Sequence, residues 1–139
     1  MNRRRIESTA LVLISLLMLP VALQAAFAPR SFFDDFPLGR GWIAQPGDAY
    51  NEHLVRDVGV LFIAMIIVTL WTVWRRLPAR PIAVAWLVQG VLHLLYHAGH
   101  LDGYETADQV GLVVSLVAVP VLAVIALWAG SSPTGERTR

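Results

Sequence analysis

Long apolar stretches alternate with short polar segments along the chain. Four of these stretches stand out, and they cover residues 9–28, 54–74, 82–101 and 110–128. Each is about 20 residues long, and at a rise of about 1.5 Å per residue a helix of that length spans the roughly 30 Å hydrocarbon core of a bilayer. The pattern therefore predicts four transmembrane helices, with a longer loop over residues 29–53 between the first two.

The connection between the second and third stretches predicts how these two helices pair. It covers residues 75–81 and contains Pro78 and Pro81, which stop one helix and allow the next to start. A connection this short favours antiparallel neighbours. We therefore expect the helices over residues 54–74 and 82–101 to pack side by side. The expected fold is all-α, an integral membrane four-helix bundle that forms one domain over the whole chain.

Two features qualify the four-helix pattern. The first stretch follows the positive residues 3–5 and ends in the small-x-small sequence of residues 26–28, which is also the form of a cleavable secretory signal. Removal of this segment would leave three helices. In the fourth stretch, Pro120 should kink the helix. Three glycines inside the predicted helices favour close helix packing: Gly59, Gly90 and Gly111.

The composition supports a membrane protein. Hydrophobic residues make up 56% of the chain and charged residues only 15%, whereas soluble domains have roughly 45–50% and about 25%. The chain has no cysteine, which excludes disulfides, thiolate metal sites and dithiol redox chemistry. A net charge of +1 gives no reason to expect a nucleic-acid partner. The expected partner is the lipid bilayer, and a membrane protein or a further copy of the chain are further candidates.

Arginines are concentrated on one side of the predicted bundle. That side holds Arg3, Arg4, Arg5, Arg75, Arg76, Arg80, Arg137 and Arg139. The opposite loops hold only Arg30, Arg40 and Arg56. Because positive residues favour the cytoplasmic side, we expect both termini in the cytoplasm and the protein in the plasma membrane. The other side carries most of the acidic residues, so it should attract cations.

The loop over residues 29–53 is rich in aromatic residues. They are Phe32, Phe33, Phe36, Trp42 and Tyr50. Aromatic side chains among Gly and Pro are typical of a segment at the membrane interface, and we expect this loop to cover the outer mouth of the bundle. Asp34 and Asp35 are within reach of that mouth, although a solvated interface loop is the favoured interpretation.

Histidines in the third stretch are the most informative feature of the sequence. His93, His97 and His100 lie at positions i, i+4 and i+7, so they project from one face of the predicted helix. Gln89 lies one turn deeper on the same face. Ionisable groups inside a membrane helix are costly and indicate function by default, and His93 is the deepest of the three.

Two further residues complete the candidate site. His53 and Asp57 lie four residues apart at the start of the second stretch. Counted outward from the turn near Pro78, Asp57 is level with His97 and His100 if both helices rise equally. Imidazole and carboxylate ligands suit iron, zinc, copper or manganese. The sequence therefore predicts a transition-metal site formed by His53, Asp57, His93, His97 and His100, with Glu52 or Asp102 orienting a ligand histidine.

Other interpretations of these residues stay open. Acids favour a helix N-terminus and histidines a C-terminus, so helix-dipole complementarity alone could explain a structural polar network. Haem ligation by His53 with His97 or His100 is less favoured, because all four histidines gather at one side and no second axial pair exists. A proton path is also less favoured, because beyond Gln89 the third stretch offers only Trp86 and alanines.

One stretch of the sequence resembles a known group of proteins. The segments SFFDDFP, GRGW and YNEHLVRDVG, followed by HLLYHAGHLD, cover residues 31–109 with gaps. They resemble small four-helix membrane proteins of actinobacteria that have no assigned function, and the topology is similar to that of DoxX-type bundles. The resemblance implies the fold but no activity and no catalytic residue.

Two functions are consistent with the sequence. The first is binding of a transition metal ion at the His/Asp cluster on the extracytoplasmic side. The alternative is a structural or accessory subunit of a membrane complex, without a bound cofactor. Whether the chain is an enzyme is not decided by the sequence, because catalysis needs an open coordination position and a substrate path.

Overall fold

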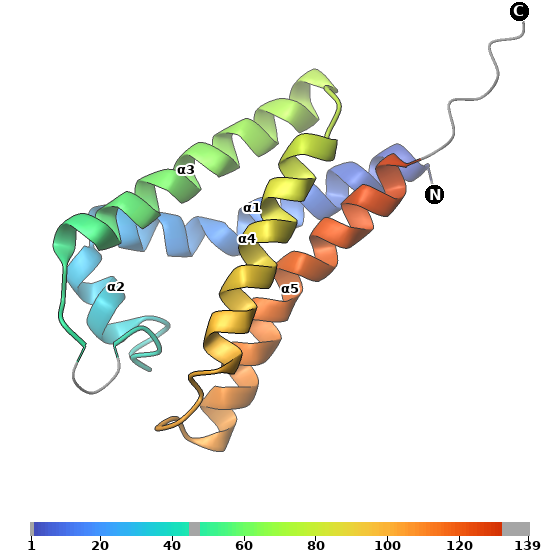
Figure 1. The fold of residues 1–139 in the computed structure, drawn as a ribbon. Helices are drawn as coiled ribbons and strands as arrows, with labels where there is room; N and C mark the ends of the chain where they lie inside the picture. The colour runs from blue at the N-terminus through green and yellow to red at the C-terminus, as the bar shows by residue number, and fades with distance from the viewer. Residues whose placement is uncertain (1, 45–47, 132–139) are drawn as a thin grey trace, which may run out of the picture.

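The computed structural model describes residues 2–44 and 48–131, and every regular element in these ranges is an α-helix (Figure 1). The helices are α1 (Arg3–Phe27), α2 (Pro29–Asp35), α3 (Glu52–Arg75), α4 (Arg80–Ala98) and α5 (Thr106–Gly130). Four of them, α1, α3, α4 and α5, are long and apolar enough to cross a membrane. The prediction of an all-α bundle of four membrane helices is confirmed.

The observed helix bounds differ from the predicted ones mainly at the polar ends. The segment over residues 29–53 begins with the short helix α2, which the hydrophobic pattern did not predict. The third long helix ends at Ala98, three residues before the predicted boundary at Leu101. Helix α5 continues through Pro120 as one element.

Side chains next to the helix ends explain where two of the helices begin. Asn2 accepts a hydrogen bond from the amide of Arg4 at the start of α1, and Asn51 accepts one from Leu54 at the start of α3. Both satisfy a backbone N–H that lacks a partner within the helix. Helix α3 ends at Arg75, and the left-handed φ of 56° at the following Arg76 turns the chain toward α4.

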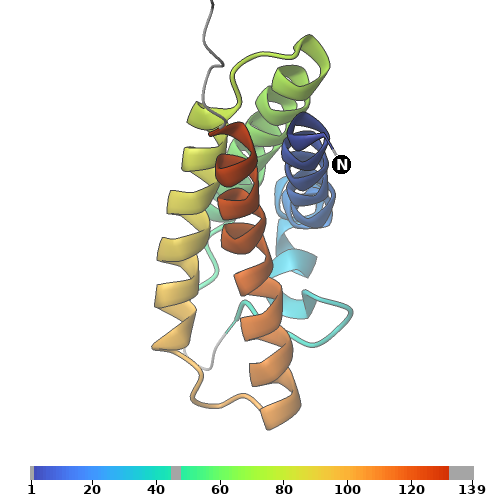
Figure 2. The same cartoon turned by 90° about the vertical axis from the view of Figure 1, so that its right-hand side faces the viewer.

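The two ends of the bundle carry different residues, and we name them accordingly. The arginine end contains the start of α1, the α3–α4 turn and the end of α5, which lie together in Figures 1 and 2. The histidine end contains the start of α3 and the α4–α5 connection. Arg137 and Arg139, which we expected on the side of the other arginines, lie outside the described residues.

The helices pair differently from the sequence-based expectation. Helix α1 packs extensively against α3 and α5, and α4 packs against α5. Helices α3 and α4 meet only over a short part of their length and diverge away from their turn, as Figure 1 shows. The expected side-by-side packing of α3 and α4 is therefore wrong. A short turn brings two helix ends together but does not force the two axes to stay close.

Small residues explain why α3 follows α1. At Gly59 the two helices approach so closely that an added Cβ atom would lie 2.3 Å from the backbone nitrogen of Ala26. Ala25 and Ala26 are buried at this crossing. Arg56, one turn earlier, donates a hydrogen bond of 2.6 Å to the carbonyl oxygen of Ala26. This crossing draws the start of α3 toward α1 and away from α4.

A second close approach holds α4 on α5. An added Cβ atom at Gly90 would lie 2.8 Å from the Cδ atom of Pro120, which is itself buried. The proline ring and the glycine are therefore complementary in shape. The prediction that the helix glycines permit close helix packing is confirmed for Gly59 and Gly90; Gly111 instead faces a loop residue, and an added Cβ atom there would lie 3.0 Å from the Trp42 ring.

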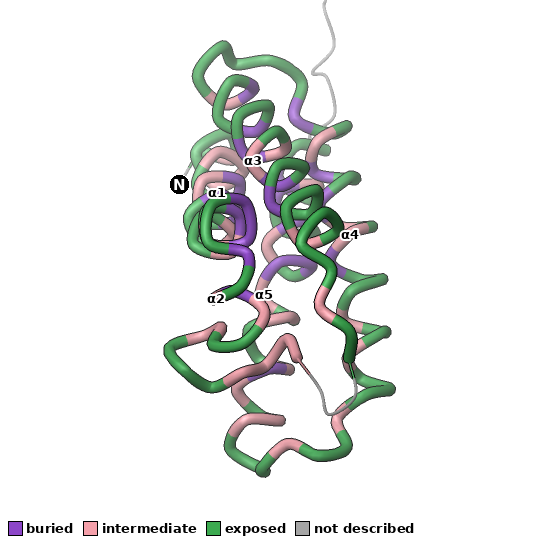
Figure 3. The backbone as a smooth tube through the Cα atoms, turned by 90° about the vertical axis from the view of Figure 1, so that its left-hand side faces the viewer, coloured by how far each residue is buried: buried purple, intermediate pink, exposed green. Residues whose placement is uncertain are grey.

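The core lies where the four long helices converge, on the side of the arginine end. Trp86 is completely buried, and its indole N–H donates a hydrogen bond of 2.8 Å to the hydroxyl of Thr69. The Phe62 ring is nearly parallel to the Trp86 ring, with centroids 6.2 Å apart. Figure 3 shows buried residues gathered at this convergence, whereas the half of α4 toward the histidine end is exposed or half-buried.

Candidate functional site

Two histidines of α4, and His100 just after its end, follow the face that forms the core at the other end of this helix. Trp86 and Gly90 are buried, and His93, His97 and His100 follow them at spacings that alternate between three and four residues. Residues at these spacings lie on one side of an α-helix. His93 and His97 therefore lie on the side of α4 that carries Trp86, which contacts α3, and Gly90, which contacts α5. We call His93, His97 and His100 the histidine stripe.

Helix α3 does not cover the histidine stripe. At the level of Trp86, α3 is close enough for the contacts with Thr69 and Phe62. Farther toward the histidine end, α3 has diverged from α4 (Figure 1). As a result His93 and His100 are exposed and His97 is half-buried. The same face of α4 is therefore buried toward the arginine end and partly exposed to its surroundings toward the histidine end.

Within the stripe, His93 and His97 form the closest pair. Their ring centroids are 4.7 Å apart, with the rings nearly perpendicular. The Nδ1 atom of His97 is buried and has no hydrogen-bond partner among the described residues. His100 differs, because its ring stacks on Tyr96 at 4.4 Å and its Nδ1 atom lies 2.7 Å from the Tyr96 carbonyl oxygen. His93 and His97 therefore form the candidate ligand pair, because their rings are adjacent and the buried nitrogen of His97 lacks a partner.

His53 and Asp57 lie elsewhere. They contact each other at 3.3 Å between Nε2 and Oδ2, and their side chains are 88% and 61% exposed. Asp57 precedes the buried Ile66 by nine residues, which is about two and a half helical turns. Asp57 therefore lies on the opposite side of α3 from Ile66. This side faces away from the core, so the equal depth that the residue count predicted does not bring Asp57 to the histidine stripe.

The five predicted ligands do not converge within one chain. In residues 2–44 and 48–131 no three His, Asp or Glu side chains are placed to hold one metal ion together. The residues expected to orient a ligand are also engaged or distant. Glu52 forms an ion pair of 2.8 Å with Arg56, and Asp102 is exposed in the α4–α5 connection. The pair His93 and His97 is what the structure retains of the predicted site.

A polar cluster that the sequence did not predict anchors the long loop to α5. Asp108, in the first turn of α5, forms an ion pair with Arg40 and accepts a hydrogen bond of 3.0 Å from the Trp42 indole. The Tyr104 hydroxyl donates to the carbonyl oxygen of Trp42 at 2.7 Å. The Trp42 ring lies against Gly111. We call Arg40, Trp42, Tyr104 and Asp108 the loop anchor; a Trp in a glycine-rich loop was its only sequence signal.

The acidic residues of α2 serve local contacts. Asp34 forms an ion pair of 2.6 Å with Arg30, and Asp35 accepts a hydrogen bond from the Ser31 hydroxyl at 3.2 Å. The Phe33 and Tyr50 rings contact each other edge to face at 5.3 Å. Both carboxylates therefore have partners within α2.

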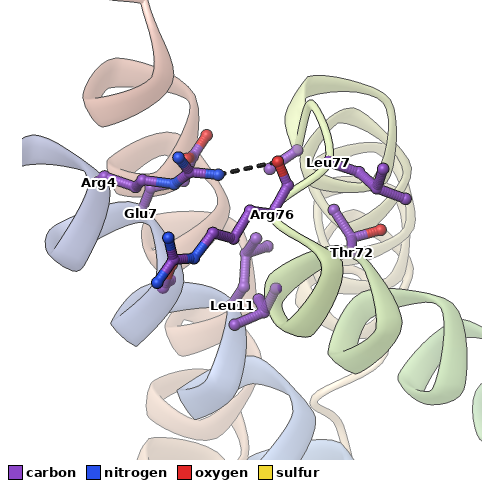
Figure 4. Close-up of a pocket in the computed structure, with 9 residues that line it drawn as sticks. Arg4, Glu7, Leu11, Thr72, Arg76 and Leu77 are labelled. Carbon is purple, nitrogen blue, oxygen red and sulfur yellow. Dashed lines mark hydrogen bonds between the residues drawn. The ribbon is translucent and has the colours of Figure 1, made fainter.

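A small cavity lies at the arginine end, far from the histidine stripe. Figure 4 shows Arg4 reaching across from α1 to donate a hydrogen bond of 2.8 Å to the carbonyl oxygen of Arg76, with Glu7 and Leu11 beside it. The cavity volume of about 10 Å³ is enough for about one water molecule. This contact closes the end of α3 and leaves no room for an organic ligand.

Comparisons with protein-family models, with curated proteins and with solved structures found no match to this chain. The resemblance to actinobacterial four-helix membrane proteins therefore stays a prediction.

Proposed function

We propose that the chain is a membrane protein that binds a transition metal ion through His93 and His97 of α4. One observation carries the proposal. Two imidazoles four residues apart lie side by side with centroids 4.7 Å apart, and the Nδ1 atom of one of them is buried without a hydrogen-bond partner among the described residues. A buried nitrogen without a partner costs free energy unless a ligand satisfies it.

The chemistry of the pair favours a borderline metal ion. Neutral imidazole is a common ligand for zinc, copper, iron and nickel, whereas magnesium and calcium prefer oxygen. Two histidines at positions i and i+4 on a helix can hold one ion together. The position of the pair within a helix that is apolar enough to cross a membrane adds weight, because histidine in such a helix is costly and tends to serve a ligand or a partner.

The arginine end is the cytoplasmic end in this proposal. Arg3, Arg4, Arg75, Arg76 and Arg80 all lie there, and positive residues favour the cytoplasmic side of a plasma membrane. The histidine stripe then lies near the extracytoplasmic side. Metal ions from outside the cell would reach His93 and His97 without crossing the bilayer.

Metal analysis of the purified protein tests the proposal. Protein in detergent is stripped with a chelator, loaded with zinc, desalted and analysed for bound metal, with iron, copper and manganese as competitors. We expect bound zinc in the wild type and its loss in His93→Ala and His97→Ala, because each removes one ligand. His53→Ala is the matched control and should retain zinc. Equal zinc in the wild type and His97→Ala, or none in the wild type, would contradict the proposal.

A second candidate function is that of an accessory subunit of a membrane complex. It is favoured by His93, which is exposed although it lies in a helix that is apolar enough to cross a membrane. In this alternative a helix of another protein covers the stripe and forms hydrogen bonds with it. A wild-type protein without bound metal that co-purifies with one membrane protein, and loses it in His97→Ala, would support this alternative.

A further inference from the structure

We infer that the arginine end binds the phosphate group of an anionic phospholipid where α1 meets the α3–α4 turn. Arg4, Arg75 and Arg76 surround this position, and we call them the headgroup site. The inference is independent of metal binding at the histidine end. Three observations lead to it: an excess of positive charge without carboxylate partners, two arginines that share one gap, and a third that lies on exposed tryptophans.

The arginine end carries a large excess of positive charge. In the described part of this end, six arginines accompany a single acidic residue, Glu7. The Glu7 carboxylate is turned toward the end of α5, where an added Cβ atom at Gly130 would lie 2.5 Å from its Oε1 atom. The ion pairs of the described chain lie in α2, at the loop anchor and at the start of α3, and none includes a residue of the headgroup site. The headgroup site therefore has no carboxylate partner among the described residues.

Two arginines of the headgroup site share one gap between α1 and the turn. Arg4 reaches from α1 to donate a hydrogen bond of 2.8 Å to the carbonyl oxygen of Arg76. Figure 4 shows the Arg76 side chain extending in the other direction, from the turn toward α1, and both residues line the same small cavity. Like charges at short range repel each other. An anion that contacts both guanidinium groups would remove this repulsion.

Phosphate is the anion that fits two adjacent guanidinium groups. The planar guanidinium donates two parallel N–H···O bonds to phosphate oxygens. The cavity between α1 and the turn holds only about one water molecule, so the phosphate contacts the arginines at its mouth. Both Arg4 and Arg76 are exposed there. A headgroup can therefore reach them from the bilayer surface without entering the bundle.

Arg75 indicates that the phosphate belongs to a lipid. Its guanidinium lies 5.4 Å from the Trp71 ring centroid and 5.6 Å from the Trp74 ring centroid. These tryptophans are 51% and 69% exposed. Exposed tryptophan at the end of a membrane helix is typical of the bilayer interface, where the ring meets the acyl chains and a nearby cation meets the headgroups. Arg75 therefore lies at the depth of phospholipid phosphates, where a soluble phosphate compound is the less suitable occupant.

Membrane orientation alone does not explain this arrangement. The preference of arginine for the cytoplasmic side depends on how many arginines a loop carries. It does not require Arg4 and Arg76 to meet across a gap without a carboxylate. Anionic lipids attract arginines near the membrane surface, and each arginine strengthens the attraction about fivefold.

Native mass spectrometry of the full-length protein tests the inference. Protein in detergent is mixed with equal amounts of phosphatidylglycerol, which is anionic, and phosphatidylcholine, which is zwitterionic, and the lipids that stay bound are counted. The test variant is the double variant Arg75→Gln with Arg76→Gln. Arg30→Gln is the matched control, because it removes an exposed arginine whose charge is already paired with Asp34. A double variant with lysine at both test positions retains the charge.

We expect the wild type to prefer phosphatidylglycerol about tenfold or more. The double glutamine variant should lose most of this preference, whereas Arg30→Gln and the double lysine variant should keep it, because lysine still attracts phosphate as a point charge. Arg75→Gln alone removes a side chain that lies on exposed tryptophans and not in the core. It should lower the preference about fivefold, and it replaces the double variant if that variant does not fold.

Two results would overturn the inference. The first is equal retention of both lipids by the wild type, or an unchanged preference in a folded glutamine variant. The second is release of phosphatidylglycerol by inorganic phosphate but not by sodium chloride at the same ionic strength, which would identify a soluble phosphate compound as the occupant.

Discussion

Single small residues set the closest contacts of this protein. Gly59 allows α3 to touch the backbone of α1 at Ala25 and Ala26, and Gly90 receives the ring of Pro120. In a membrane the hydrophobic effect does not draw helices together, so close van der Waals packing carries more of the association. A larger side chain at such a position would push the two helices apart where they cross.

Gly59→Leu should destabilise the bundle strongly. The new Cβ atom would lie 2.3 Å from the Ala26 nitrogen, and the contact is with backbone, which cannot move aside as a side chain can. Overpacking of this kind costs about 1–3 kcal/mol or more. Thermal unfolding of the protein in detergent measures the effect. Gly99→Ala is the control, because its nearest heavy atom would be 3.6 Å away; equal melting temperatures for both variants would contradict the described crossing.

The elements divide into two helix pairs and one anchored loop. Helices α1 and α3 form one pair and α4 and α5 the other, and contacts between α1 and α5 join them. The loop after α2 is held to the start of α5 by Arg40, Trp42 and Asp108. The two pairs diverge toward the histidine end, and the loop anchor connects them there. The histidine stripe is partly exposed because α3 diverges from α4 at this end.

Asp108→Ala should release the loop from α5. The variant removes the partner of the Arg40 guanidinium and of the Trp42 indole at once. Because local opening exposes a segment to proteases, we expect trypsin to cleave after Arg40 severalfold faster than in the wild type. Peptide mapping over time measures the rate. Asp102→Ala, in the exposed α4–α5 connection, should not change it, and unchanged cleavage in Asp108→Ala would show that the loop is held by other contacts.

The two ends of the molecule carry different polar residues. The arginines of α1, of the α3–α4 turn and of α4 lie at one end, and the histidines lie toward the other. Trp71 and Trp74 lie at the arginine end, where the Arg75 guanidinium is 5.4 and 5.6 Å from their ring centroids. Such aromatic and arginine contacts are typical of a membrane–water interface.

Thiol labelling in intact cells tests the proposed orientation. In a chain without cysteine, Leu77→Cys marks the arginine end and Asp102→Cys marks the histidine end. Because arginines favour the cytoplasmic side, a membrane-impermeant thiol reagent should label residue 102 in intact cells and residue 77 only after permeabilisation. The reverse pattern would place the histidine stripe in the cytoplasm and remove the external route for metal ions.

The sequence alone determined those features that depend on short stretches of chain. Four runs of apolar residues predicted the four long helices, because transfer of a helix into lipid depends on its own residues. The common face of His93, His97 and His100 was also predictable, because helical phase depends only on spacing. The end of α4 at Ala98 and the short helix α2 were harder to predict from the sequence, because polar segments near the membrane interface lack a strong periodic pattern of apolar residues.

Tertiary structure alone decided which helices face each other. The pairing of α3 with α1 rather than α4 depends on Gly59 meeting Ala25 and Ala26, residues about thirty positions apart along the chain, and no local pattern encodes that complementarity. For the same reason the sequence placed Asp57 beside the histidine stripe, whereas the structure turns it away. What the sequence predicted as a five-residue site became a two-histidine pair on an open face, because helix packing, not depth along the chain, determines which side chains meet.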